Sequence, residues 1–272
     1  MKRYKLIVSD FDGTLRASDG GVSAGNAAAI RKFIESGGVF AICTGRMPDS
    51  ILPHAKKLGL EGPIVAYQGA YIEDIATGKT VRDRRIANED AVRICAFLQQ
   101  GGGHVHVYDG ETLYINRDDD FRRWYESICN VRGVLTPQDI AAVVREKHIE
   151  PHKILAVCAA EERDALFAEA ERRFGAEFYV TTSTDNLVEV VSRGCDKGDA
   201  LRYLAAHYGV PVEESIGIGD NHNDLPLVQA AGLGVAIGNA VKALKDAADV
   251  TAPCCDEDGV GYIVRKYGLG EE

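Results

Sequence analysis

The segment YKLIVSDFDGTL, residues 4–15, decides the fold, because an apolar run stops abruptly at two acidic residues. Residues 6–8 are Leu, Ile and Val, a run typical of a strand that is buried on both faces. Asp10 and Asp12 follow it with one residue between them. The need for a turn would explain one aspartate and the next glycine. It does not explain similar polar groups after other predicted strands, so we expect a chemical role here.

The pattern of a strand followed by a helix recurs at both ends of the chain. An amphipathic stretch from Ser23 to about Glu35 predicts a helix, with Ser23 in the position of its N-cap. Residues 39–45 (VFAICTG) and 63–69 (PIVAYQG) predict two further buried strands, and helical periodicity lies between them. SIGIGD (residues 215–220) and LGVAIG (residues 233–238) predict strands near the other end. Strands that alternate with helices indicate an α/β fold with a Rossmann-like parallel sheet.

The middle of the chain has a different pattern. HVHVYDGETLYIN, residues 104–116, predicts a β-hairpin, and helices and further strands follow it. A mixture of hairpins and helices predicts an α+β domain with an antiparallel sheet. We therefore expect a core made of residues 1–81 and 191–272, with a cap domain inserted between them as residues 82–190.

Composition limits the partners of the protein. The net charge is -10 and the pI is about 5.3, so the average surface field disfavours nucleic acids and anionic membranes. A small-molecule phosphate ester stays compatible if positive charge is concentrated locally. The sequence predicts no signal peptide or membrane span, and its seven scattered cysteines form no C-x-x-C pair. We expect reduced thiols in a cytoplasmic protein of unknown oligomeric state.

Polar side chains follow several of the predicted strands, at the points where those strands end. The C-terminal ends of parallel strands share one edge of a sheet, where ligands bind. We expect one loop residue, ahead of a helix, to reach the same edge. The residues are Asp10 and Asp12, then Thr44, Gly45 and Arg46, then the loop residue Lys197, and finally Asp220, Asn223 and Asp224.

This set of side chains fits phosphoryl transfer. Carboxylates without accompanying His or Cys ligands suit Mg²⁺, which also allows neighbouring carboxylates to be ionised together. The Thr44 hydroxyl and the Gly45 N–H can hold phosphoryl oxygens, and Lys197 can neutralise their charge. Asp10 can attack phosphorus to give an aspartyl phosphate. Asp12 is close enough to serve the leaving group as an acid.

Four motifs extend this argument to a family. DFDGTL, ICTGR, DKG and GDNHND occur in this order over nearly the whole chain and resemble the motifs of the haloacid dehalogenase (HAD) superfamily. The long insert between the second and third motifs resembles the cap of the Cof-type (subclass IIB) sugar-phosphatase branch. The resemblance implies a Mg²⁺-dependent phosphatase for a small phosphorylated metabolite, with a sugar phosphate as the expected class.

The resemblance also implies a role for each motif residue. It implies a nucleophile at Asp10, a general acid and base at Asp12, phosphate contacts at Thr44 and Lys197, Mg²⁺ ligands at Asp10, Asp220 and the main-chain carbonyl of Asp12, oxygen contacts at Asn223, and orientation of Lys197 by Asp224. Two positions depart from the family pattern, since Gln68 replaces a frequent Asn and His222 replaces a frequent acid. The roles of both stay open. Arg46 is a candidate substrate contact, although packing beside the strand end is favoured.

The same residues are compatible with other functions and other structural roles. A phosphomutase would use the same core but return phosphate to a reoriented sugar, and a binding module would keep the fold without turnover. His104 and His106 share one face of a predicted strand. Two ligands are too few for a metal site, so a surface strand is favoured. The acidic run at residues 118–120 fits the start of a helix better than a metal cluster.

Overall fold

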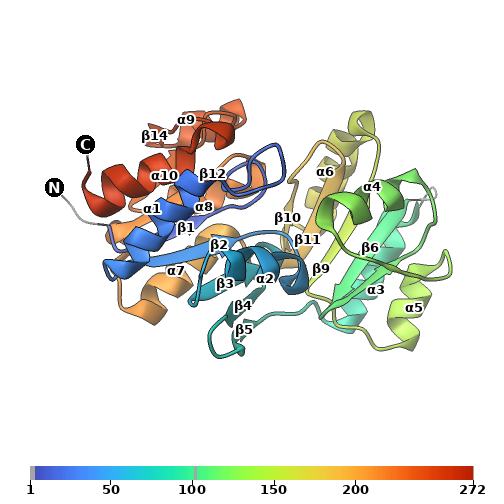
Figure 1. Ribbon diagram of the computed structural model, residues 1–272. Helices are drawn as coiled ribbons and strands as arrows, with labels where there is room; N and C mark the ends of the chain where they lie inside the picture. The colour runs from blue at the N-terminus through green and yellow to red at the C-terminus, as the bar shows by residue number, and fades with distance from the viewer. Residues whose placement is uncertain (1–3, 101–102, 272) are drawn as a thin grey trace. The chain divides into compact units, whose positions relative to one another are not determined.

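The computed structural model describes residues 4–100 and 103–271, and the chain divides into two compact units. Each unit has a sheet of its own (Figure 1). The first unit comprises Met1–Thr44, Leu52–Val81 and Asp196–Glu272, and the second comprises Gly45–Ile51 and Arg82–Cys195. In the part of the chain described, no helix combines the length and the apolar character needed to cross a membrane.

The first unit is built on an eight-stranded sheet with the order β14-β13-β12-β1-β2-β3-β4-β5. Its strands are β1 (Leu6–Ser9), β2 (Val39–Cys43), β3 (Pro63–Ala66), β4 (Tyr71–Asp74), β5 (Lys79–Asp83, whose last two residues group with the second unit), β12 (Ser215–Gly219), β13 (Leu233–Ala236) and β14 (Val250–Thr251). The central strand β1 runs parallel to both β12 and β2, whereas β4 is antiparallel to β3. The predicted parallel sheet is therefore confirmed, and an antiparallel strand extends it.

Helices cover both faces of this sheet. They are α1 (Ala24–Glu35), α2 (Pro48–Lys57, whose first turn groups with the second unit), α7 (Lys197–Tyr208), α8 (Leu225–Ala230), α9 (Lys242–Ala247), α10 (Gly259–Ile263) and a π-helix, η6 (Val264–Leu269). Leu6 and Val8 pack in a core with α7 and α8, and α1 and α10 lie side by side (Figure 1). A strand covered on both faces has no solvent-facing position, which explains the unbroken apolar run.

Helix α1 begins where the sequence predicts it. The side chain of Ser23 accepts a hydrogen bond from the backbone N–H of Asn26, at 3.0 Å, and so caps the helix. Gly37 follows the helix with a φ of +90°, a conformation that glycine adopts without a steric penalty. The cap and the glycine together set both ends of the helix that leads into β2.

The second unit is built on a six-stranded sheet with the order β10-β11-β9-β6-β7-β8. Its strands are β6 (His104–Asp109), β7 (Thr112–Ile115), β8 (Val134–Leu135), β9 (Lys153–Val157), β10 (Phe178–Thr181) and β11 (Leu187–Ser192). Its helices are α3 (Asn88–Leu98), α4 (Asp120–Cys129), α5 (Ile140–Glu146) and α6 (Ala160–Phe174). All strand pairs except β7 with β8 are antiparallel, as the predicted α+β insert requires.

The two faces of this second sheet differ in character. Val105 and Val107 of β6 point into an apolar core with α3, α5 and α6. His104 and His106 alternate with them and are also buried, with exposed fractions of 3% and 0%. The prediction that these histidines lie on a surface strand was therefore wrong. The ring of His106 packs against Tyr125 of α4, so this helix accounts for the burial.

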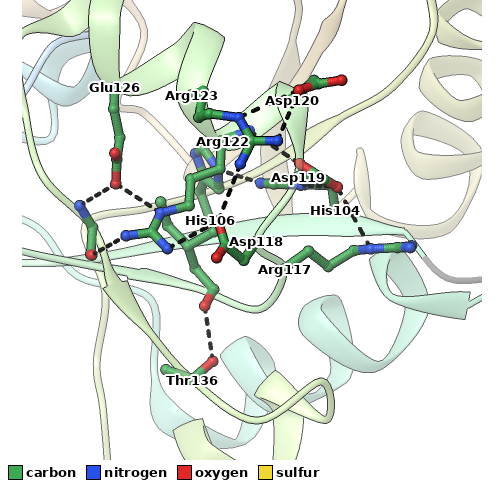
Figure 2. A network of polar contacts seen from close by, with 12 residues as sticks. His104, His106, Arg117, Asp118, Asp119, Asp120, Arg122, Arg123, Glu126 and Thr136 are labelled. Carbon is green, nitrogen blue, oxygen red and sulfur yellow. Dashed lines mark hydrogen bonds and ion pairs between the residues drawn. The ribbon is translucent and has the colours of Figure 1, made fainter.

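A chain of hydrogen bonds connects the two histidines to the start of α4 (Figure 2). Asp119 caps α4 and lies 3.0 Å from Nδ1 of His104, whose Nε2 is 2.8 Å from Nε2 of His106. Burial lowers the pKa of both histidines, so both rings are neutral near pH 7. If Asp119 accepts from His104, then His106 donates to His104, and Nδ1 of His106 is a buried acceptor with no partner within residues 4–100 and 103–271.

The buried histidine His106 makes stability depend on pH. Its pKa lies well below 6.5 in the folded protein, so the unfolded chain binds more protons below about pH 6.5 and stability falls as the pH falls. We expect the drop in Tm between pH 7.5 and pH 5.5 to be smaller in His106→Asn than in the wild type, by about 2–4 °C for each kcal/mol removed.

Circular dichroism at both pH values measures this difference. His207→Asn changes an exposed histidine of α7 and is the matched control, which should keep the wild-type drop. An equal drop in His106→Asn and the wild type would contradict the prediction.

Candidate active site

The ends of adjacent parallel strands bring three carboxylates together in the first unit. Ser9 of β1 lies opposite Ile218 of β12, so the residues that follow both strands share one edge of the sheet. Carboxylate oxygens of Asp10, Asp220 and Asp224 lie within 4.8 Å of one another. We call these three residues the acidic cluster.

Lys197 is the cation that the fold places in this cluster. It is the first residue of α7, whose cap Asp196 accepts a hydrogen bond from the N–H of Asp199. The side chain is completely buried, and its Nζ lies 2.5 Å from Oδ1 of Asp10 and 2.5 Å from Oδ1 of Asp224. Burial opposes the charge on Lys197, but the two carboxylates outweigh it and raise the lysine pKa well above its ordinary value.

Asp224 has both of its carboxylate oxygens engaged. While Oδ1 binds Lys197, Oδ2 accepts hydrogen bonds from the backbone N–H groups of Asp220 (2.9 Å) and Asn221 (3.1 Å). These bonds cap the short helix η4 (His222–Asp224). Asp224 therefore joins the loop after β12 to Lys197 and is placed to orient the ammonium group.

Asp220 lies against Gly13 and Thr14, the two residues that follow Asp12, and its position explains why a glycine and a threonine occur there. Thr14 donates its hydroxyl hydrogen to Oδ1 of Asp220 at 2.9 Å. A Cβ atom at Gly13 would lie 2.6 Å from Oδ2 of Asp220, and its φ of +76° also favours glycine. The carbonyl of Gly13 accepts a hydrogen bond from Asn239, at 2.7 Å. Contacts from two distant segments thus hold the DGT loop against Asp220.

The charges of the acidic cluster fit a divalent cation. Three carboxylates face one lysine, and burial, followed by the charge of Asp224, raises the pKa of Asp220 to about 7. Burial also raises the pKa of Asp10 well above its ordinary value, although Lys197 opposes the shift. A hard cation would relieve this excess of negative charge, and oxygen ligands without His or Cys suit Mg²⁺. Because Asp224 is engaged elsewhere, Asp10 and Asp220 are the side chains that would hold it.

Asp12 is not part of the acidic cluster. Its Oδ1 accepts a hydrogen bond from Nη1 of Arg16 at 3.0 Å, and its side chain is 43% exposed. The isolated bridge between the same two residues closes the loop after β1. The sequence does not predict the contact between Asp12 and Arg16. The two residues are four positions apart, but in a loop this spacing does not determine which side chains meet.

Thr44 and Asn223 lie at two other strand ends of the first unit. Thr44 follows β2, is 2% exposed and donates its backbone N–H to Val65. Asn223 lies on η4 after β12 and is 5% exposed. His222 begins η4, and its backbone N–H donates to Asn221. The phosphate contacts expected of Thr44 and Asn223 stay predictions.

Gly45 and Arg46 group with the second unit. The carbonyl of Gly45 accepts a hydrogen bond from Lys153 at 2.7 Å. The buried guanidinium of Arg46 donates to Ser50 at 3.0 Å and to the carbonyl of Ile128 at 2.8 Å. These contacts match the packing alternative for Arg46, while its substrate contact and the phosphate contact of Gly45 stay predictions.

Comparison with known proteins places this arrangement in a family. A family model described as haloacid dehalogenase-like hydrolase matches residues 7–264. The chain belongs to this family. A Haemophilus influenzae protein with the word phosphatase in its name is 32% identical over 263 residues, which cover 97% of this chain and 98% of the relative. The Bacillus subtilis 5-amino-6-(5-phospho-D-ribitylamino)uracil phosphatase YwtE is 28% identical over 98% of this chain and 99% of its own.

A solved structure supports the same assignment. A protein from Plasmodium vivax described as a HAD/COF-like hydrolase superposes with a TM-score of 0.87 and 25% identity, covering 97% of this chain and 95% of that one. The predictions of a HAD-type hydrolase, of its Cof-type branch and of its fold class are confirmed.

The fold of this HAD-family hydrolase also reveals residues that the sequence analysis did not single out. Thr14 lies in the loop that carries Asp12 and ties it to Asp220, and Asn239, after β13, donates a hydrogen bond to Gly13 of the same loop. Asn239 also accepts a hydrogen bond from the N–H of Cys255, at 3.0 Å. The position of Thr14 inside DFDGTL was the only available signal, and nothing in the sequence pointed to Asn239.

Replacing Lys197 should destabilise the hydrolase more than replacing any exposed lysine. Lys197→Met leaves Asp10 and Asp224 buried without their cation, and breaking a buried pair in this way costs about 3–5 kcal/mol. The loss should be smaller at pH 5.5 than at pH 8, because orphaned buried carboxyls take up protons more readily than carboxyls in the unfolded chain.

Urea unfolding in the presence of EDTA measures both effects. Lys32→Met removes an exposed lysine of α1 and is the control, expected to cost less than about 1 kcal/mol. A loss in Lys197→Met as small as in the control, or one that grows towards low pH, would contradict the prediction.

Proposed function

We propose that this hydrolase is a Mg²⁺-dependent phosphatase that cleaves a small phosphorylated metabolite, with a sugar phosphate as the substrate class, through an aspartyl phosphate on Asp10. The observation that carries the proposal is the buried contact of Lys197 with Asp10, beside Asp220. A nucleophile held by a cation within a surplus of carboxylates suits attack on an anionic phosphoryl group. The names of the relatives support the same reaction class.

The proposed reaction has two displacements. In the first, a carboxylate oxygen of Asp10 bonds to phosphorus as the ester P–O bond breaks, and Asp12 gives its proton to the departing alkoxide. In the second, the oxygen of a water molecule bonds to phosphorus while Asp12 takes a proton from that water, and the P–O bond to Asp10 breaks. Bound Mg²⁺ would supply positive charge to the phosphoryl oxygens. Lys197 favours the ionised form of Asp10 that the first step needs.

Thr44, Gly45, Lys197 and Asn223 are the proposed phosphate contacts. In the same proposal, residues 1–81 and 191–272 form the catalytic core, and residues 82–190 form the cap that determines specificity. The name of YwtE describes a substrate whose phosphate sits on a ribityl chain, which supports a phosphorylated sugar or polyol as the class for this chain.

Asp10→Asn should abolish turnover, because an amide is neither a comparable nucleophile nor a comparable cation ligand. We expect release of inorganic phosphate to fall at least about 100-fold across a panel of sugar phosphates and other monoesters. EDTA should stop the wild type, and added Mg²⁺ should restore it. Asp246→Asn, at an exposed aspartate on α9 that pairs with Lys242, is the control with unchanged activity.

The outcomes of this assay separate the alternatives. A wild type that converts one hexose phosphate to another without releasing phosphate would indicate a phosphomutase. A wild type without activity on any monoester would indicate a binding module. Equal activity in Asp10→Asn and wild type would refute the nucleophile.

Asp12→Asn should affect good and poor leaving groups differently. A sugar alkoxide needs a proton from Asp12, so its release should slow by about 100-fold or more, whereas nitrophenolate leaves without one. With p-nitrophenyl phosphate we therefore expect a burst of nitrophenolate followed by slow turnover, since the second step still lacks its base. Rapid quench and mass spectrometry of the acid-trapped phosphorylated protein measure the burst. Equal loss with both substrates and no trapped intermediate would count against this role.

A further inference from the structure

The turn after β3 contains two consecutive non-glycine residues with left-handed backbone. Tyr67 and Gln68, in the short helix η1 (Tyr67–Gly69), have φ values of +51° and +61°. Both side chains are completely buried. Such conformations are unfavourable for residues with a Cβ atom, and they persist where the surrounding contacts require them. Such outliers cluster at functional sites, so the hydrogen bonds that Gln68 makes are candidates for a functional role.

Gln68 links the ends of two other strands of the first unit. Its backbone N–H donates to the carbonyl of Thr44, after β2, at 3.0 Å. Its side-chain Oε1 accepts a hydrogen bond from Nδ2 of Asn223, after β12, at 3.2 Å. The short helix η1 also packs against α7, which begins at Lys197. Gln68 therefore joins two of the four proposed phosphate contacts, Thr44 and Asn223, and its helix η1 packs against α7, which carries another at Lys197.

The hydrogen bond from Asn223 has a directional consequence. A side-chain amide presents a donor group on one side and an acceptor on the other, and rotation by 180° exchanges them. The bond to Oε1 of Gln68 fixes the NH₂ group of Asn223 on the side of Gln68. The carbonyl oxygen of Asn223 then keeps one orientation, on a helical turn that Asp224 anchors to the acidic cluster.

We propose that Gln68 is a positioning residue for phosphate transfer. Its side chain holds the amide of Asn223 in one orientation, and its backbone N–H holds the carbonyl of Thr44 at the end of β2. This inference rests on the proposed phosphatase function. A glutamine that serves only to fill space and satisfy buried polar groups would affect stability but would have no specific coupling to Asn223 in catalysis.

A double-mutant cycle tests the proposal with three variants: Gln68→Met, Asn223→Ala and the double variant. Methionine keeps the length and volume of glutamine but cannot accept the hydrogen bond of Asn223. We expect Gln68→Met to lower kcat/KM about 10- to 100-fold, mainly through kcat, as for other partners that orient active-site groups. The double variant should be no slower than Asn223→Ala, because Gln68 then has no amide to hold.

Controls separate a structural effect from a positioning effect. Gln138→Met makes the same substitution at an exposed glutamine of the second unit and should leave kcat/KM unchanged. Thermal unfolding without substrate or metal is measured for every variant. It should show that Gln68→Met is folded at the assay temperature and that its Tm shift does not account for the loss of kcat.

Each outcome bears on a different statement. If the wild type hydrolyses phosphate monoesters and Gln68→Met is within twofold of it, or if the effects of the two single substitutions multiply in the double variant, the positioning role is wrong while the phosphatase function stands. If the wild type itself hydrolyses none, the proposed function fails, and the inference about Gln68 fails with it.

Discussion

The buried contact of Lys197 with Asp10 and Asp224 is the interaction on which the first unit depends. An ammonium group with no exposed surface is tolerated because two carboxylates lie 2.5 Å from it. The carboxylates in turn are tolerated because of the lysine. Burial of any one of these charges would be strongly unfavourable without the others. The three charges therefore hold the loop after β1, the loop after β12 and the start of α7 together.

The rest of the sheet can be understood as the support for this arrangement. Parallel pairing of β1 with β12 aligns the two strand ends, and the completely buried strand β1 is covered by helices on both faces. Gly13 leaves room for Asp220, and Asp224 caps η4 while it binds Lys197. The fold concentrates negative charge at one edge of the sheet, and that surplus is what a divalent cation and a phosphoryl group together would use.

Local patterns allowed much of the fold to be predicted. The strands β1, β2, β12 and β13, the cap of α1 at Ser23 and the hairpin at residues 104–116 follow from apolar runs and turn residues. The expected proximity of Asp10, Lys197 and Asp220 is also observed. It followed from a general property of parallel sheets, whereas the catalytic roles of these residues remain proposals.

Contacts between distant segments could not be predicted in the same way. The polar edge strand β5 gives no apolar signal, and the helices α3 and α5 were not assigned. His106 is buried only because α4 covers it, which its own strand does not indicate. The bond of Thr14 to Asp220 spans 206 positions. The left-handed turn at Gln68 follows β3 and is hydrogen-bonded to Thr44 after β2 and to Asn223 after β12, so its partners are distant in the sequence.

The order of the chain has a consequence for protein synthesis. Lys197 leaves the ribosome 187 positions after Asp10, once the whole second unit has been synthesised. At the usual rates of translation this interval lasts roughly 10–40 s. During that time β1 has neither β12 beside it nor α7 and α8 over Leu6 and Val8, so these apolar side chains lack those packing partners in the nascent chain. Strand β1 is therefore a segment that chaperones specific for extended apolar sequences could bind during this interval.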